Sequence, residues 1–170
     1  MGRGREPSRG AATDKKGAPP EIRVLARNRR ASHEYHLEET FEAGVALLGS
    51  EVKSLRDHKA QLADAYVQIR DGEAWLMHLD IPQYPFSHNR NHEPRRDRKL
   101  LVHKSEIHKL QVRSHERGYT ILPVEIYLRG RHIKVKIALA RGKQLYDKRE
   151  AEKKRVQKRE IEAATSAKRR

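Results

Sequence analysis

Several short stretches of this chain alternate apolar and polar residues with a period of two, the pattern of half-buried β-strands. The clearest stretch runs from Ile133 to Leu139, where every second side chain is apolar and two of the intervening ones are lysines. Less regular alternation predicts further strands in residues 66–70, 74–81 and 119–128, and a pair of short strands in residues 33–48. Within this pair, Gly44 suits a bulge or a sharp bend.

Two glycine-containing dipeptides predict the turns between these strands. Asp71-Gly72 separates residues 66–70 from 74–81 and is a strong hairpin signal, and Arg129-Gly130 precedes the last strand. Residues 50–56 and 105–115 have helical spacing, with Ser50 and Ser105 as the predicted N-caps. Residues 82–98 contain three prolines and few apolar residues, so we expect a long exposed loop there.

About six short strands and two small helices predict a mainly β domain over residues 22–140. An OB-like closed antiparallel β-barrel with flanking short helices is the expected architecture, because closure leaves no strand edge open. Residues 1–21 are mostly Gly, Pro, Ser, Ala and charged residues, so we expect a disordered basic leader. Residues 141–170 are rich in helix formers but lack a continuous apolar stripe. This C-terminal tail is expected to be disordered alone and helical when bound.

The charge of the chain indicates its class of partner. Its 38 lysine and arginine residues outnumber 23 aspartate and glutamate residues, giving a net charge of +15, which attracts polyanions. Residues 141–170 hold 12 basic and five acidic residues, and so carry nearly half of this surplus. No apolar run approaches the roughly 20 residues of a spanning helix, and no secretory signal is present. The absence of cysteine fits a reducing compartment, so we expect a cytoplasmic protein that binds RNA.

Charged side chains in two places are candidates for RNA contact. Residues 88–104 contain six arginine and lysine residues and three histidines, which suit phosphate binding and base stacking, although an ordinary solvated loop remains an alternative. Glu42 could accept a hydrogen bond from a base edge, or it could be a surface acid paired with an arginine. His88 and His92 have a metal-like spacing, but without cysteine we expect neither a metal nor a cofactor.

The sequence gives little support for an enzyme. It contains no Walker loop, no GxGxxG and no GxSxG motif, and no pair of acids has the arrangement of an acid–base dyad. A ribonuclease that uses a pair of the ten histidines is the main alternative to a non-enzymatic RNA-binding protein. A generic basic protein of the ribosome is a third possibility.

Eight blocks of the chain, in order, resemble the SsrA-binding protein (SmpB) family of bacteria, over about 120 of the 170 residues. They are NRRA (28–31), HEY (33–35), FEAGV (41–45), GSEVKSLR (49–56), DAYV (64–67), GEAWL (72–76), RKLLVHK (98–104) and GKQLYDKRE (142–150). This sequence departs from the family's pattern at two tail positions. Tyr146 stands where some members have histidine, and Gln144 stands where lysine is common.

The resemblance implies an adaptor that binds the tRNA-like domain of transfer-messenger RNA and delivers it to stalled ribosomes, the process called trans-translation. Alanyl-tRNA synthetase and elongation factor Tu act on the same RNA. The tail of the family senses the empty messenger channel near the decoding region of the small subunit and folds there. The RNA-binding residues implied by position are His33, Glu42, Arg98, Lys99, Leu101 and His103. The implied ribosome-contacting residues are Gly142, Lys143, Tyr146, Asp147, Lys148 and Arg149.

Overall fold

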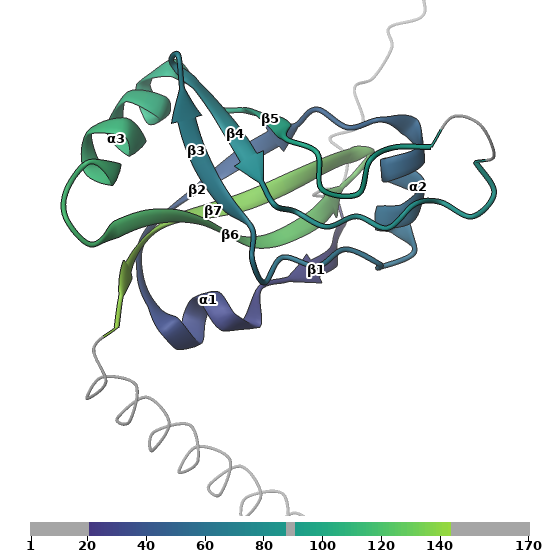
Figure 1. The fold of residues 1–170 in the computed structure, drawn as a ribbon, viewed down its shortest axis with the longest axis horizontal. Coiled ribbons are helices and arrows are strands. Elements are labelled where there is room, and N and C mark those ends of the chain that lie inside the picture. The colour runs from purple at the N-terminus through teal and green to yellow at the C-terminus, as the bar shows by residue number, and fades with distance from the viewer. Residues whose placement is uncertain (1–20, 88–90, 144–170) are drawn as a thin grey trace, which may run out of the picture.

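A computed structural model of the chain describes residues 21–87 and 91–143, which form seven strands and three short helices (Figure 1). In chain order these are β1 (Ile22–Arg27), α1 (Arg29–Glu34), β2 (Tyr35–Val45), α2 (Gly49–Arg56), β3 (Tyr66–Arg70), β4 (Glu73–Met77), β5 (Arg98–Leu101), α3 (Lys104–Ser114), β6 (Tyr119–Arg129) and β7 (His132–Gly142). No helix among these residues is long and apolar enough to cross a membrane.

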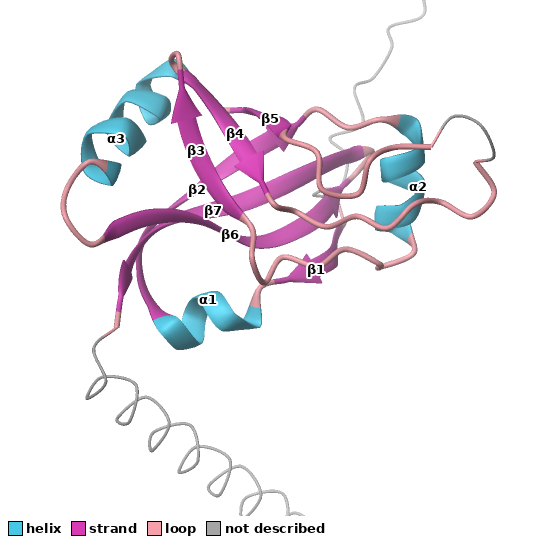
Figure 2. Ribbon diagram, in the orientation of Figure 1, coloured by secondary structure: helices cyan, strands magenta, loops and turns pink. Residues whose placement is uncertain are grey.

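The strands pair antiparallel and close on themselves. The order β6-β3-β4-β5-β2-β7 returns to β6, because β6 and β7 also pair along their whole length. On its other edge, β6 meets β3 at Ile121 and then β1 from Glu125 to Arg129. The closed ring is consistent with the expected OB-like barrel, and short helices flank it (Figure 2).

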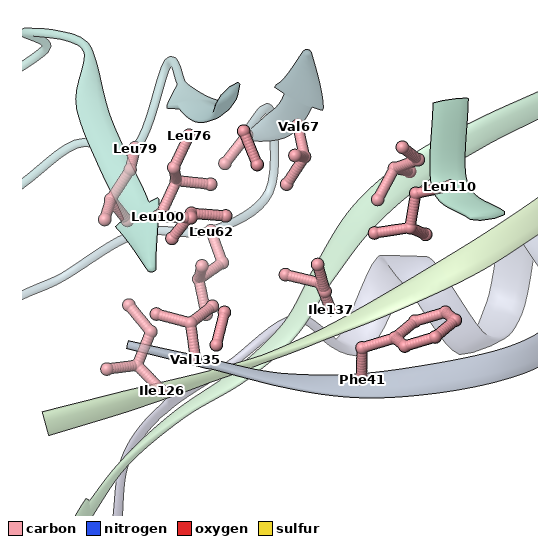
Figure 3. Close-up of a cluster of buried hydrophobic side chains, with 14 of the residues drawn as sticks. Phe41, Leu62, Val67, Leu76, Leu79, Leu100, Leu110, Ile126, Val135 and Ile137 are labelled. Carbon is pink, nitrogen blue, oxygen red and sulfur yellow. The ribbon is translucent and has the colours of Figure 1, made fainter. Parts of the chain in front are cut away.

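The interior of the barrel is filled by aliphatic side chains that alternate along the strands. Val135, Ile137 and Leu139 of β7 are almost completely buried, which confirms the pattern that predicted this strand. Figure 3 shows Val135 and Ile137 in one cluster with Leu76 of β4 and Leu100 of β5. Burying one such side chain contributes about 1.5–3 kcal/mol, so this cluster is the main source of stability.

An extra residue in β2 gives the chain a second, smaller cluster. Leu37 pairs with Ala140 and Glu39 pairs with Leu139, so Glu38 is an added residue without a strand-pairing partner on β7. Such a bulge shifts the alternation by one, so side chains after Glu38 point to the opposite face of the sheet. Leu37 therefore packs outside the barrel against Ala31 of α1, whereas Phe41 points into the main core. The bulge lies here and not at Gly44, the position expected to form a bulge or a sharp bend.

Asn28 fixes the helix that covers this second cluster. Its Oδ1 accepts from the backbone N–H of Ala31 at 3.1 Å, which caps α1. Its Nδ2 donates to the carbonyl oxygens of Leu62 and Pro123, both at 3.1 Å. One buried amide thus joins α1 to the loop before β3 and to strand β6.

The structure corrects several predicted elements. The helix α1 and the strand β1 were not expected, and β2 is one strand of 11 residues where a pair of short strands was predicted. The helices α2 and α3 begin one residue before the predicted serines, with Leu48 and His103 as N-caps. The reason is a glutamate in each first turn, Glu51 or Glu106, that accepts from the backbone N–H of the N-cap residue.

The hairpin of β3 and β4 is confirmed. Asp71 and Gly72 have φ values of 50° and 73°, and both are positive as a type I′ turn requires.

Candidate nucleic-acid interface

Four of the six predicted RNA-binding residues line one open groove of about 600 Å³. Glu42 comes from β2, Lys99 and Leu101 come from β5, and His103 is the N-cap residue of α3. The hairpin turn at Gly72 and Glu73 closes one side of the groove, and the start of α3 closes another. The other lining residues are Leu100, Val102, Lys104, Glu106, Ile107 and Lys134.

The alternation of β5 decides which of its side chains reach the groove. Arg98 and Leu100 are buried, whereas Lys99 is partly exposed and Leu101 is 59% exposed. Leu101 is therefore an apolar side chain presented to solvent between charged neighbours. Lys99 pairs with Glu73 of the adjacent hairpin, and its side chain remains 42% exposed. The groove thus offers both cationic and apolar contacts.

Glu42 stands at the edge of this groove within a small polar cluster. The hydroxyl of Tyr127 donates to Oε2 of Glu42, and Nη1 of Arg129 lies 3.2 Å from each carboxylate oxygen. Nζ of Lys134 lies 3.5 Å from Oε1. The Glu42 side chain is 38% exposed, so it is an acid paired with arginine that also remains accessible to a ligand.

This cluster fixes the charge states of both partners. The hydrogen bond from Tyr127, together with the nearby cations, holds the pKa of Glu42 below its usual value even though partial burial acts in the opposite direction. Burial and the bond to Glu42 raise the pKa of Tyr127 to about 12. At neutral pH the groove therefore contains an ionised carboxylate, which is a hydrogen-bond acceptor only.

Arg98 is not at the surface, which corrects its expected place in the interface. Its side chain is fully buried, and its Nε donates to Oε1 of Glu51 at 2.9 Å. Its two terminal nitrogens donate to backbone carbonyl oxygens of Leu79, Arg96 and Pro94 at 2.6–2.9 Å. The guanidinium is therefore occupied by the protein, and its role is to hold the loop after β4 against the barrel.

The segment 82–98 is also more closely held than a solvated loop. The Arg96 guanidinium donates to both oxygens of Glu51, at 2.8 and 2.6 Å. His92 is only 3% exposed, and its ring nitrogens lie 2.9 Å from Oγ of Ser50 and from the carbonyl oxygen of Ile81. Residues 88–90 lie outside the described residues. In the rest of this loop, the buried contacts of His92 and Arg98 correct the prediction of a long exposed loop, although other residues such as Phe86 are exposed.

His33 lies away from the groove. It is exposed near the end of α1, two residues before β2 begins, and Glu42 follows nine positions later in the chain. A strand rises about 3.3 Å per residue, so the two residues are on the order of 20 Å apart. The structure therefore does not bring His33 together with the other predicted RNA-binding residues.

The first two predicted tail residues lie near His33 instead. Gly142 ends β7, and the backbone N–H of Lys143 donates to the carbonyl oxygen of Glu34 at 2.9 Å. Nζ of Lys143 donates to the carbonyl oxygen of Ser32, also at 2.9 Å. Tyr146, Asp147, Lys148 and Arg149 lie outside the described residues, as does the leader up to residue 20.

Sequence reasoning missed three members of the Glu42 cluster. Tyr127 and Arg129 follow Glu42 by 85 and 87 residues and belong to β6, and Lys134 belongs to β7. The only available signal was the outward position of Lys134 in the alternation of the last strand. In the described part of the chain, no group of three or more His, Asp or Glu side chains is arranged to hold a metal ion.

Comparisons with known proteins give a consistent result. A family model described as SmpB protein matches residues 25–167. An SsrA-binding protein of Thermobifida fusca is 50% identical over 149 residues, which cover 88% of this chain and 92% of that protein. One from a Roseiflexus species is 52% identical over 143 residues, covering 84% and 90%. A solved chain described as "tmRNA-SmpB: a journey to the center of the bacterial ribosome" is 43% identical, with a TM-score of 0.62, over 72% of this chain and 86% of that chain.

Proposed function

This chain belongs to the SmpB family, and we propose that it is an RNA-binding adaptor that binds the tRNA-like domain of transfer-messenger RNA and delivers it to stalled ribosomes. The observation that supports this most is the meeting of Glu42 with Lys99, Leu101 and His103 in one groove, because Glu42 lies more than 50 residues before the segment 99–103 that supplies the others. The related solved chain is described together with tmRNA and the bacterial ribosome.

The chemistry of the groove fits structured RNA. Lys99, Lys104 and Lys134 supply positive charge for phosphates, and Leu101 offers an apolar surface to a ribose or a base. The ionised Glu42 accepts a hydrogen bond from an amino or imino group on the edge of a base, whereas a phosphate has no such donor. Phosphate contacts set the position of the RNA, and the carboxylate adds discrimination between bases.

The proposal divides the work between the barrel, residues 22–140, and the tail, residues 141–170. The barrel presents fixed groups to one RNA shape, and the tail tests the messenger channel near the decoding region of the small subunit. The tail is proposed to fold only where a vacant, phosphate-lined channel surrounds it, because the contacts there offset the entropy cost of folding. When message fills the channel, the tail cannot make these contacts. The residues proposed for this contact are Gly142, Lys143, Tyr146, Asp147, Lys148 and Arg149.

The proposed activity needs no catalytic residue and no cofactor, and the protein would act in the cytoplasm, where ribosomes work. Alanyl-tRNA synthetase and elongation factor Tu would act on the same RNA while the adaptor is bound. Incubation of the protein with labelled transfer-messenger RNA in the absence of metal tests the ribonuclease alternative. We expect intact RNA, and specific cleavage fragments would favour that alternative.

A truncation separates the two proposed modules. The truncated variant ends at Lys143. This end point is chosen because β7 extends to Gly142 and Lys143 contacts α1, so the barrel keeps these contacts. We expect unchanged affinity for the tRNA-like fragment and loss of peptide tagging on stalled ribosomes. If the truncated chain no longer bound the fragment, the assignment of RNA recognition to the barrel would be wrong.

A further inference from the structure

The most exposed large apolar side chain in the described part of the protein belongs to Phe86, which is 78% exposed. It lies in the loop after β4, which runs alongside α2 (Figure 2). Its ring packs edge-on against Tyr84, with ring centroids 5.6 Å apart and planes at 64°. Nζ of Lys53, on α2, lies 5.4 Å from the centroid of the Tyr84 ring. Two aromatic rings and a cation therefore form one surface.

Partly buried hydrogen bonds hold the loop that presents these rings. The side chain of Asn91 accepts from the backbone N–H of Tyr84 at 3.1 Å and donates to its carbonyl oxygen at 2.9 Å. Ser54 of α2 donates to the carbonyl oxygen of Pro82 at 2.6 Å. Phe86 is thus exposed on a fixed support, which lowers the entropy cost of binding a ligand against it.

The exposed charge of α2, the helix that places Lys53 over the Tyr84 ring, is positive. Lys53 and Arg56 are exposed on α2, and the only acid of that helix, Glu51, is buried against Arg96 and Arg98. Within the described residues, no ion pair joins Lys53 or Arg56 to a carboxylate. An exposed ring and a partly exposed ring, beside cations without a carboxylate partner among the described residues, match the way proteins hold single-stranded nucleic acid. There, bases stack on the rings and phosphates meet the cations.

We propose that Phe86 and Tyr84, together with Lys53 and Arg56, form a second RNA-contact surface that stacks an unpaired base and binds its phosphate. The inference rests on the proposed function in one respect, that the partner is RNA. None of these four residues lines the Glu42 groove. The helices α2 and α3 lie at opposite ends of the view in Figure 2, so the barrel can hold two RNA segments at once.

The full-length Phe86→Trp variant provides a direct reporter, because a base stacked on an indole quenches its fluorescence. The native chain has one tryptophan, Trp75 in β4, and its signal is subtracted with the unmodified protein. We expect a single-stranded 12-nucleotide uridine oligomer to quench the added emission, and a duplex of equal length to leave it unchanged. Quenching by RNA-free ribosomal proteins, without quenching by the oligomer, would overturn the inference in favour of a protein partner.

Binding constants supply the second readout. Phe86→Ala should weaken binding of the single strand by about 5- to 100-fold, the range of one lost base stack. Val112→Ala is the matched control, because Val112 is 53% exposed on α3 and lies outside both surfaces, and it should have no effect. Lys53→Gln should lower the slope of log K against log salt by about 0.7, the value for one phosphate contact on a single strand.

Two further partners identify the source of the base and keep the two proposals separate. The affinity of Phe86→Ala is measured for transfer-messenger RNA and for ribosomes. The partner whose binding the substitution weakens is the one that supplies the stacked base. If Phe86→Ala binds the oligomer, transfer-messenger RNA and ribosomes as the native chain does, the inference is overturned. Normal binding of transfer-messenger RNA by the native chain would then leave the proposed function standing. Failure of the native chain to prefer transfer-messenger RNA would instead refute the proposed function.

Discussion

Gly44 of β2 lies directly opposite Leu101 of β5, and a methyl group on Gly44 would stand 3.2 Å from the Cβ of Leu101. This separation is shorter than an ordinary carbon–carbon contact. Leu101 is the exposed apolar side chain of the groove, so its position depends on the lack of a side chain at Gly44. The groove is therefore shaped by the strand pairing beneath it as well as by its own lining residues.

Substitution of Gly44 tests this dependence. We expect Gly44→Ala to displace Leu101 and to weaken binding of the tRNA-like fragment several-fold. The free energy of unfolding should change by no more than about 1 kcal/mol, because alanine also reduces the backbone entropy of the unfolded chain. Gly49→Ala is the matched control, since nothing lies within 4 Å of the added methyl group. Equal affinity of Gly44→Ala and the native chain would show that Leu101 does not depend on Gly44.

The buried Glu51–Arg98 pair should govern stability. Arg98→Met leaves the Glu51 carboxylate buried with Arg96 as its remaining partner, and removal of one member of a buried pair costs about 3–5 kcal/mol. We expect a loss in this range in urea unfolding at pH 7. The same experiment on Arg95→Met is the control, since Arg95 forms an exposed pair with Asp80. A loss below 1 kcal/mol for Arg98→Met would contradict the structural role assigned here.

Lys99, the residue after Arg98, should affect RNA binding and not stability. Lys99 points into the groove, so Lys99→Gln should leave the free energy of unfolding nearly unchanged and weaken RNA binding. The slope of log K against log salt should fall by about 0.9, the value for one phosphate contact on a duplex. Titration of the tRNA-like fragment at several salt concentrations measures it. An unchanged slope would mean that Lys99 serves only its pair with Glu73.

Tyr127 should make the stability of the barrel depend on alkaline pH. Its pKa of about 12 in the folded protein lies above the value near 10 of an unfolded chain. Between these two values the folded protein keeps a proton that the unfolded chain loses, so the free energy of unfolding falls as pH rises. The loss is on the order of 2 kcal/mol. Unfolding at pH 9 and pH 11.5 measures it, and Tyr127→Phe should remove this part of the slope. An equal slope in both proteins would show that Tyr127 titrates normally.

The sequence predicted elements whose signals are local. The alternation from Ile133 to Leu139 and the Asp71-Gly72 turn depend on neighbouring residues only, and both are found in the structure. The helix α1 has six residues and only Ala31 buried, so it has no apolar stripe to detect. The strand β1 buries only Leu25 among six residues, and this leucine falls between the apolar Val24 and Ala26, so the strand shows no clean apolar–polar alternation.

The site was predictable only in part, for a related reason. The family resemblance selected Lys99 and Leu101, and the alternation of β5 presents both to the groove. The same resemblance selected Arg98, whose charge suggested the surface. Its burial depends on Glu51, which lies 47 residues earlier in the chain. A buried charge needs a partner from another element, and a sequence does not show which elements meet.

The affinity of the full-length chain for the tRNA-like fragment, relative to bulk tRNA at one salt concentration, tests the central claim most directly. The native chain should prefer the fragment, and Glu42→Ala should lose most of that preference while its unfolding curve shows an intact fold. This result would assign discrimination between RNAs to the groove, in accord with the ionised Glu42 beside Tyr127 and Arg129. Equal affinity of the native chain for the two RNAs would contradict specific recognition. An unchanged dissociation constant for Glu42→Ala would reduce Glu42 to a paired surface acid.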